Sequence, residues 1–267
     1  MEGFRAEVIS DTHLNMWKHK PEQMVKIFSL QAPNLILAGD IGDPDDSSLH
    51  MFLNIARNKY KRVFYVPGNH EFYKADGSKK NPAAVLEWFQ KLDDQWPNFH
   101  FFYRRNELID GVRILGATCW STAPEGTEWA NLISREGKKD IEFIEQGLSN
   151  SIEPVLVISH YPSTLRVIED GFRGKLSQFN YGQDLERLYR YPLHTWVFGH
   201  VHQKHDFSLP YASSLYGTGS VRIICNPYGY PTDPTAARKT LSFQVPRKDE
   251  GHLVGVRSPY DTMYQML

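Results

Sequence analysis

Apolar residues follow two patterns in the first half of the chain. Some form short continuous runs closed by Gly, Asp or Asn, which is typical of buried strands. We predict strands at three such runs: 6–10, 34–38 and 62–66. Between them, apolar residues recur every three or four positions, which is typical of a helix with one buried face. We predict these helices at 21–30, 47–57 and 82–96, the last with Asn81 as its cap and Pro82 in its first turn.

The second half continues this alternation with longer connections. We predict strands at 112–118, 155–159, 195–198 and 221–225, and helices at 138–148 and 184–189. The stretch before Lys138 has no clear period, and the tail from about residue 232 is polar and left unassigned. Alternating strands and helices indicate an α/β protein with buried central strands. Because no linker or change of composition divides the chain, we expect one domain over residues 1–267.

Composition restricts the class of protein. Hydrophobic residues make up 41% and charged residues 23% of 267 positions, so the chain can bury a sizeable core and is not of the disordered class. The formal net charge of -1 gives no overall attraction to nucleic acid or to an anionic membrane. Cys119 and Cys225 lie in apolar stretches and are expected to be buried thiols. Since no signal-like start and no apolar run of about 18 residues is present, we expect a cytoplasmic protein with no membrane partner.

Five predicted strands end in residues that can bind a metal or move a proton. They are Asp11 and His13, Asp40 and Asp43, Asn69 and His70, His160, and His200 and His202. Singly, each has an ordinary explanation, because an Asp after a strand often caps a turn and an isolated His is more often part of the core than a ligand. Together they are not ordinary, because the carboxyl ends of strands in an α/β sheet converge on one edge.

The residue types favour a metal centre. Carboxylates, imidazoles and one amide, without a thiolate, suit Mn, Fe or Zn. The set is too large for one ion and sufficient for two ions that share a carboxylate. Pairs of ions about 3.5–4 Å apart serve in-line displacement at phosphorus. We therefore expect two divalent or trivalent ions, with Mn as the first choice and Fe, Zn or Mg as alternatives.

The chain resembles the calcineurin-like metallophosphoesterase superfamily in a complete set of motifs: Asp11-x-His13, Gly39-Asp40-x-x-Asp43, Gly68-Asn69-His70-Glu71, His160 and Gly199-His200-x-His202. The segment Asn226 to Pro231 also resembles the one that follows the last core strand in small members. The resemblance implies an α/β fold of four layers, an α/β/β/α sandwich in which two mixed sheets pack face to face and helices flank them.

The resemblance also implies a role for each residue. Asp11, His13 and His202 would hold the first metal, Asn69, His160 and His200 the second, and Asp40 would bridge them. His70 would lie beside the ions without binding either and act as the general acid, and Asp43 would contact His70. Two cations lower the pKa of a bridging water, so a hydroxide nucleophile exists near neutral pH. His70 can protonate the leaving oxygen because an imidazolium is available near physiological pH.

The residues at and after Asp43 differ from those of two subgroups of the superfamily. Protein serine/threonine phosphatases carry Asp-Arg-Gly at the second motif, where this chain has Asp43 followed by Pro44 and Asp45. Purple acid phosphatases carry Tyr at the position of Asp43. Neither subgroup matches this chain.

Two segments after the motifs are candidates for substrate recognition: 72–80 and 163–181. Both contain aromatic and cationic side chains, which could stack a base and pair with phosphate. We expect substrate contacts from Asn69, Phe172, Arg173 and Phe179. An equally weighted alternative is that both segments are solvated loops.

These observations predict a dinuclear-metal-dependent phosphoester hydrolase for a small-molecule or nucleotide phosphomonoester or phosphodiester. A metal-dependent nuclease is the second enzyme candidate, but no long basic stripe supports a nucleic-acid partner. A non-catalytic scaffold on the same fold is the alternative outside enzymes. Such scaffolds lose ligands or the acid histidine, and here none is missing.

Overall fold

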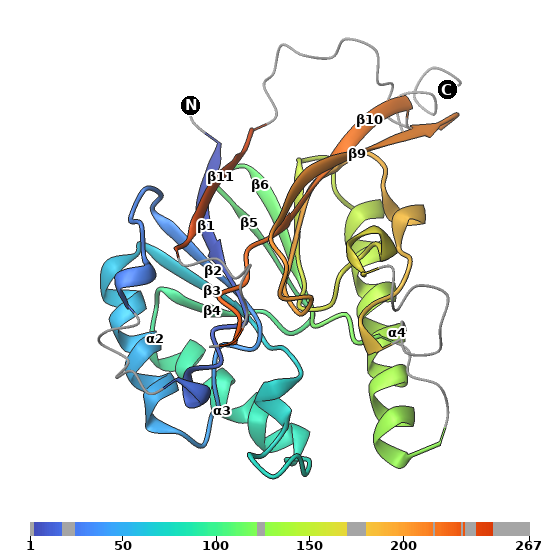
Figure 1. Ribbon diagram of the computed structural model, residues 1–267. Coiled ribbons are helices and arrows are strands. Elements are labelled where there is room, and N and C mark those ends of the chain that lie inside the picture. The colour runs from blue at the N-terminus through green and yellow to red at the C-terminus, as the bar shows by residue number, and fades with distance from the viewer. Residues whose placement is uncertain are drawn as a thin grey trace.

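Two β-sheets lie face to face at the centre of the molecule, with helices on the outer side of each (Figure 1). The computed structural model describes residues 3–17, 25–121, 126–169, 180–215, 217–230, 232 and 239–247. The two facing sheets and the helices outside them confirm the predicted four-layer α/β/β/α arrangement.

The first sheet has five strands in the order β11-β1-β2-β3-β4. Its strands are β1 (Phe4–Ile9), β2 (Asn34–Ala38), β3 (Arg62–Val66), β4 (Phe99–Phe101) and β11 (Leu241–Val245). β1 to β4 are parallel, and β11 runs antiparallel to β1. Helices α2 (Ser47–Lys59) and α3 (Pro82–Gln95) flank this sheet (Figure 1).

The second sheet has six strands in the order β5-β6-β7-β8-β10-β9. Its strands are β5 (Arg105–Ile109), β6 (Val112–Gly116), β7 (Val155–Ile158), β8 (Leu193–Phe198), β9 (His205–Ser213) and β10 (Gly217–Cys225). The four central strands are parallel, and the two edge strands run antiparallel to their neighbours. Helix α4 (Glu128–Ser149) flanks this sheet on the side away from the first (Figure 1).

The central strands are buried on both faces. In β2, Leu35 and Leu37 pack in the larger hydrophobic cluster, which includes the apolar side chains of α2 and α3, while Ile36 and Ala38 pack in the cluster between the sheets. Successive side chains of a strand point to opposite faces, so a strand covered on both sides must be apolar throughout. This burial explains why the central strands are continuous apolar runs.

The predicted helices 47–57 and 82–96 are confirmed as α2 and α3. The Asp46 side chain caps α2 by accepting a hydrogen bond from the Ser48 amide at 2.8 Å. Asn81 caps α3 in the same way through the Ala83 amide at 3.0 Å, with Pro82 as the first helical residue.

Helix α4 begins ten residues before the helix predicted at 138–148, so the prediction of an irregular stretch up to Gly137 is wrong. Thr127 caps the helix by accepting from the Ala130 amide at 3.0 Å. Gly137 lies inside the helix, at a position where a Cβ would be 2.1 Å from the Trp120 carbonyl oxygen, so only glycine fits. The glycine permits close packing, whereas the sequence pattern suggested a break.

Other differences concern short elements. The helix predicted at 184–189 is a single 3₁₀ turn at Glu186–Leu188. Of the helix predicted at 21–30, residues 21–24 lie outside the described residues, and Val25–Ile27 forms a 3₁₀ turn. Strands β4, β5, β9 and β11 were not predicted because they are short or half-exposed and lie toward the sheet edges, where partners rather than apolar runs define them. No helix in the described part of the chain has the length and apolar character needed to cross a membrane.

Candidate metal centre

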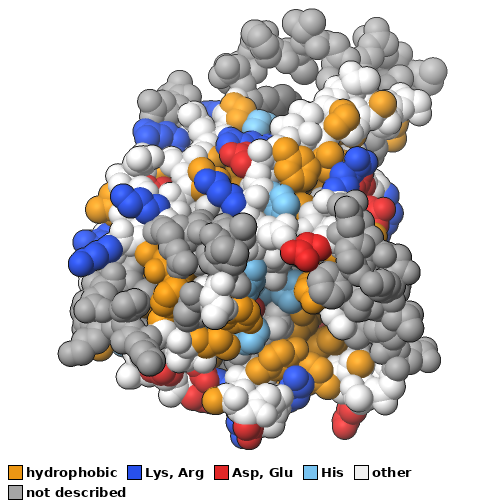
Figure 2. Space-filling view, in the orientation of Figure 1, with side chains coloured by type: hydrophobic (Ala, Val, Ile, Leu, Met, Phe, Trp, Pro, Cys, Tyr) orange, Lys and Arg blue, Asp and Glu red, His pale blue; other side chains and the backbone are white. Residues whose placement is uncertain are grey.

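The predicted ligands converge at the carboxyl ends of five strands. Asp11 and His13 follow β1, Asp40 follows β2, Asn69 follows β3, His160 follows β7, and His200 and His202 follow β8. Potential ligand atoms come together within 4.8 Å in three groups: Asp11, His13 and His202; His13, Asp40 and His70; and Asp40, His160 and His200. Figure 2 shows histidine side chains gathered near the middle of one face of the molecule.

The first group brings two imidazoles and a carboxylate to one point. Nε2 of His13 lies 3.1 Å from Nε2 of His202, and the latter lies 3.4 Å from Oδ1 of Asp11. The Asp11 carboxylate also accepts hydrogen bonds from the Ser10 hydroxyl and the His200 amide. Ring nitrogens and a carboxylate oxygen that face one another at this spacing fit a shared cation.

The third group, which contains Asp40, His160 and His200, is built around His160. Its Nε2 lies 3.3 Å from Oδ2 of Asp40 and 3.1 Å from Oδ1 of Asn69, and its ring lies 5.1 Å from the His200 ring. Its Nδ1–H donates to the Ala38 carbonyl oxygen at 3.0 Å. This second hydrogen bond fixes the tautomer and leaves Nε2 available for a metal.

Asp40 belongs to both the second and the third groups of ligand atoms. One oxygen faces His160, while Oδ1 accepts the His70 amide at 2.8 Å. The carboxylate therefore lies between His13 on one side and His160 on the other. This is the position that a bridging ligand requires.

The backbone is strained where the ligands leave the strands. Positive φ angles occur at Asp11 (52°), His13 (41°), Asp40 (55°), His200 (72°) and His202 (52°). Residues other than glycine rarely adopt this conformation, and such strain concentrates at functional sites. The fold thus holds five ligand positions in an unfavourable conformation.

Gly68 is required by close approach in the third motif. A Cβ at this position would lie 2.2 Å from Oδ1 of Asp40 and 2.8 Å from Cε1 of His160. Both contacts are far shorter than van der Waals distance, so any side chain would displace the predicted bridging ligand. The Gly-Asn-His sequence therefore has a packing reason as well as a chemical one.

Burial and charge act in opposite directions on the ligands. Burial favours a raised pKa for Asp40, but the neighbouring imidazoles, His160 first, hold that pKa well below its usual range. Burial likewise opposes charge on His160, but Asp40 raises the pKa of His160 to about 9. Burial lowers the pKa of His13 and of His200 to about 4, so these two imidazoles are neutral near pH 7 and can bind a cation without losing a proton.

Glu71 is a buried carboxylate that ties two of these loops together. It accepts hydrogen bonds from the amides of Gly68 (2.8 Å), Asp40 (3.1 Å) and Ile41 (2.8 Å) and from the Tyr65 hydroxyl (2.6 Å). Burial, reinforced by the charge of Asp40, raises the pKa of Glu71 to about 7. In the sequence, Glu71 is marked by its place directly after Asn69 and His70. An ordinary carboxylate in a turn could stand at the same place, so the sequence does not distinguish the two.

The structure places Asp43 differently from the resemblance. Its carboxylate forms an ion pair with Lys80, whose side chain is only 6% exposed, and Lys80 also lies 3.1 Å from Asp45. No contact between the Asp43 and His70 side chains occurs among the interactions of the described residues. Asp43 therefore pairs with Lys80 rather than with His70, because a buried ammonium needs a carboxylate partner.

Tyr230 takes the position beside His70. Its hydroxyl lies 3.3 Å from Nε2 of His70, and its ring stacks on His13 at 4.4 Å and lies 4.3 Å from the His202 ring. The Gly229 amide donates to the Asp11 carbonyl at 2.9 Å and so joins this segment to the loop after β1. Tyr230 had no predicted role, although the resemblance extended to its segment.

The predicted recognition residues Phe172, Arg173 and Phe179 lie outside the described residues. Within the described part of the same segment, Arg166 pairs with Glu186 at 2.9 Å. Asn69, the fourth predicted contact, lies in the metal centre itself, 3.1 Å from His160.

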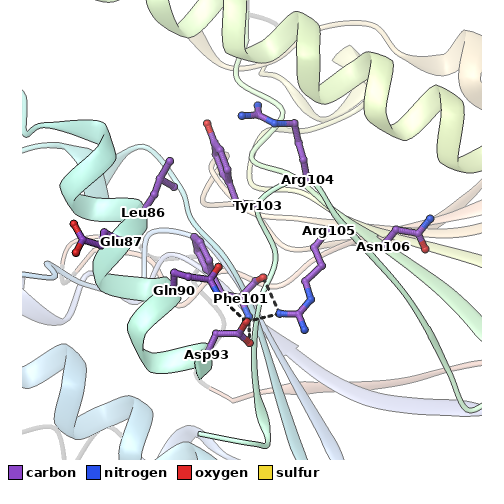
Figure 3. Close-up of a pocket in the computed structure, with 9 residues that line it drawn as sticks. All are labelled: Leu86, Glu87, Gln90, Asp93, Phe101, Tyr103, Arg104, Arg105 and Asn106. Atoms are coloured by element: carbon purple, nitrogen blue, oxygen red, sulfur yellow. Dashed lines mark hydrogen bonds and ion pairs between the residues drawn. The ribbon is translucent and has the colours of Figure 1, made fainter. Parts of the chain in front are cut away.

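A hollow beside α3 lies apart from the metal centre. Figure 3 shows this cavity of about 740 Å³, which is lined by Leu86, Glu87, Gln90, Asp93, Phe101, Tyr103, Arg104, Arg105 and Asn106. Its two cations are already paired, Arg105 with Asp93 at 2.6 Å and Arg104 with Asp140 at 2.6 Å. It shares no residue with the metal centre and offers no unpaired cation to a phosphate.

The geometry defines a class of protein: an α/β sandwich whose strand ends present carboxylate, imidazole and amide ligands for two ions. The sequence model of the calcineurin-like phosphoesterase family matches residues 5–204. The chain belongs to this family and is a metal-dependent phosphoesterase.

Individual relatives are distant. The chain is 24% identical over 232 residues to uncharacterized protein L509 of Acanthamoeba polyphaga mimivirus, covering 73% of this chain and 82% of that protein. Its fold is similar to phosphopantetheinyl hydrolase from Mycobacterium tuberculosis (TM-score 0.59, 19% identity, 87% of this chain and 91% of that chain). It is also similar to a dimetal phosphatase from Danio rerio (TM-score 0.54, 14% identity, 91% and 99%). At these identities the structural likeness establishes the fold.

Proposed function

We propose that this chain hydrolyses small phosphoesters, including nucleotide esters, at a centre of two metal ions. Asp11, His13 and His202 hold one ion, Asn69, His160 and His200 hold the other, and Asp40 bridges them. The observation that carries the proposal is the position of Asp40, whose carboxylate lies within ligand distance of imidazoles from both sites.

The chain's residues prepare the centre before any ion binds. His13 and His200 are kept neutral by burial, and the Asp40 charge is already favoured by its imidazole neighbours. When bound, two divalent ions supply Lewis-acid chemistry, lowering the pKa of water and neutralising phosphate charge. Mn is our first choice, because an oxygen- and nitrogen-rich set without thiolate suits it.

His70 is proposed to protonate the leaving oxygen. Its amide is fixed by Asp40 at 2.8 Å, which places the imidazole at the edge of the centre. The Tyr230 hydroxyl, 3.3 Å from Nε2, orients the imidazole ring. Tyr230 is therefore a positioning residue in the place that the resemblance gave to Asp43.

The decisive experiment is a substrate panel with defined metals. Metal-stripped protein is reloaded with Mn, Zn, Mg or Fe and assayed on phosphomonoesters, phosphodiesters and cyclic nucleotides. A His160→Ala variant, purified in parallel, controls for contaminating phosphatases. We expect metal-dependent turnover that this variant loses.

The same panel separates the alternatives. Single-stranded RNA and DNA are included, and faster turnover of these polymers than of small esters would identify a nuclease. Binding of two ions without turnover of any ester would identify a non-catalytic scaffold and overturn the proposal.

A further inference from the structure

A second hollow lies between α3 and α4, next to the metal centre. It has a volume of about 230 Å³ and is lined mainly by apolar side chains. We name it the aromatic pocket; its lining residues are Phe72, Pro82, Ala83, Leu86, Tyr103, Arg104, Trp120, Trp129, Leu132, Ile133 and Glu136. Figure 2 shows hydrophobic side chains gathered on the surface directly below the histidines.

Two chains of aromatic contacts join the pocket to the metal centre. On one side, the Tyr73 ring lies 5.8 Å from His70 and 5.9 Å from Trp129. On the other side, Trp120 lies 5.6 Å from Tyr161, which is itself 4.2 Å from His200. The pocket is thus one aromatic ring away from the proposed acid and one from a proposed ligand.

The pocket wall packs against the core on one side and is left partly uncovered on the other. Trp129, Leu132 and Ile133 are only half-buried, although they lie on the face of α4 that looks toward α3. Partly exposed apolar side chains around a cavity are typical of ligand sites rather than of cores.

Charge in the pocket also indicates the kind of ligand. Arg104, the cation of the lining, is paired with Glu136 at 2.9 Å and with Asp140 at 2.6 Å, so it does not call for an anion. Lys79 lies outside, with its Nζ 3.4 Å from the centre of the Tyr73 ring. The cavity therefore suits a neutral group, and flat aromatic rings pair well with Trp and Phe side chains.

We infer that the aromatic pocket binds a flat aromatic group esterified to the substrate phosphate. This inference rests on the proposed function, because the phosphate itself must lie at the metal centre. The ester bond then points from the centre past Tyr73 toward the pocket, and esters with an aromatic group are preferred over small alkyl esters.

Ala83 and Ala84 provide a matched pair of variants. Both are exposed in the first turn of α3, but only Ala83 lines the aromatic pocket, while Ala84 lines a separate hollow beside Trp88. Ala83→Phe fills the pocket, and Ala84→Phe makes the same change facing elsewhere. Trp129→Ala is a second variant, which removes a wall of the pocket.

Two measurements test the inference on the full chain. With 2-naphthyl phosphate, Ala83→Phe should lower kcat/KM by about tenfold, mainly through KM, and leave methyl phosphate unchanged. Ala84→Phe should change neither ester. Independently of turnover, an NMR titration of metal-free protein with 2-naphthol should show binding that Ala83→Phe and Trp129→Ala each weaken by several-fold.

The outcomes separate this inference from the proposed function. If no ester is hydrolysed but naphthol binds in an Ala83-dependent way, the pocket stands and the proposed function fails. If esters are hydrolysed while Ala83→Phe changes neither the naphthyl-to-methyl ratio nor naphthol binding, the inference is overturned and the proposed function stands.

Discussion

The metal centre and the aromatic pocket are neighbours built in opposite ways. The centre consists of polar side chains on strained loops, drawn from strand ends as far apart in sequence as Asp11 and His202. The pocket consists mainly of apolar side chains, several of them on the regular helices α3 and α4. Ions require donors in fixed positions, and in this fold the loops at strand ends bring these together, whereas an apolar group requires only a surface of suitable shape.

The difference teaches which part of an active site is visible in a sequence. Asp, His or Asn at one strand end has ordinary structural uses, but such residues at five strand ends form a pattern that indicates a site. Trp, Leu and Ile on a helix face are equally suited to a core, so their pattern does not. The predictions below test whether chemistry resides in the first region and selectivity in the second.

Asp40→Asn should have the largest effect. It removes the negative charge that both proposed ion sites share, so both should be lost and turnover should fall to background. Metal analysis of the purified variant, together with turnover, checks this expectation. Asp45→Asn is the control, because Asp45 is exposed and contacts Lys80 rather than the ligands. Two retained ions with normal turnover would show that Asp40 does not bridge.

His70→Ala should keep both ions and lose about 10²–10⁴-fold in kcat, the range for general acid catalysis. The loss should be larger for an alkyl ester than for p-nitrophenyl phosphate, because nitrophenoxide needs little protonation. The ratio of the two losses is the measurement, provided that chemistry limits turnover. His50→Ala, which alters a histidine packed on Trp96, is the control. Loss of an ion would instead place His70 among the ligands.

Tyr230→Phe should reduce kcat by about three- to tenfold, the value of one hydrogen bond, while KM and metal content stay the same. The ring that stacks on His13 is kept, while the contact between the hydroxyl and His70 is lost. Tyr228→Phe is the matched control, two residues earlier in the same segment. In the His70→Ala background, Tyr230→Phe should have no further effect, because the two residues act as one unit. Additive losses would disprove the positioning role.

Leu132→Ala should have the smallest effect and should separate pocket from core. Leu132 is half-buried in the pocket wall, so its truncation should lower the free energy of unfolding by about 1 kcal/mol or less. Leu148→Ala, on the same helix but fully buried, should cost about 2–5 kcal/mol. Urea denaturation of both variants checks the comparison. Equal costs would identify Leu132 as an ordinary core residue.

Much of the fold could be predicted because its central strands are buried on both faces. Apolar runs such as 34–38 and 62–66 correspond to β2 and β3, and the periodic runs at 47–57 and 82–96 to α2 and α3. The edge strands could not be predicted, because they form by pairing with a neighbour, as β11 pairs with β1, more than through the pattern of their own side chains. Gly137 suggested a helix start at residue 138, because glycine disfavours a helix interior. Its close approach to Trp120 is a matter of tertiary packing, which helix propensity does not describe.

The sequence by itself determined the chemistry, namely which residues could bind two ions and in which order the strands would deliver them. Only the tertiary structure decided the partners of those residues. In the structure Asp43 pairs with Lys80, and Tyr230 lies against His70 although the two are 160 positions apart in sequence. Residue types limit what a side chain can do, but pairing depends on distances across loops that meet only after the two sheets have packed. The aromatic pocket could not be predicted from the sequence for the same reason, because α3 and α4 come together only in the folded structure.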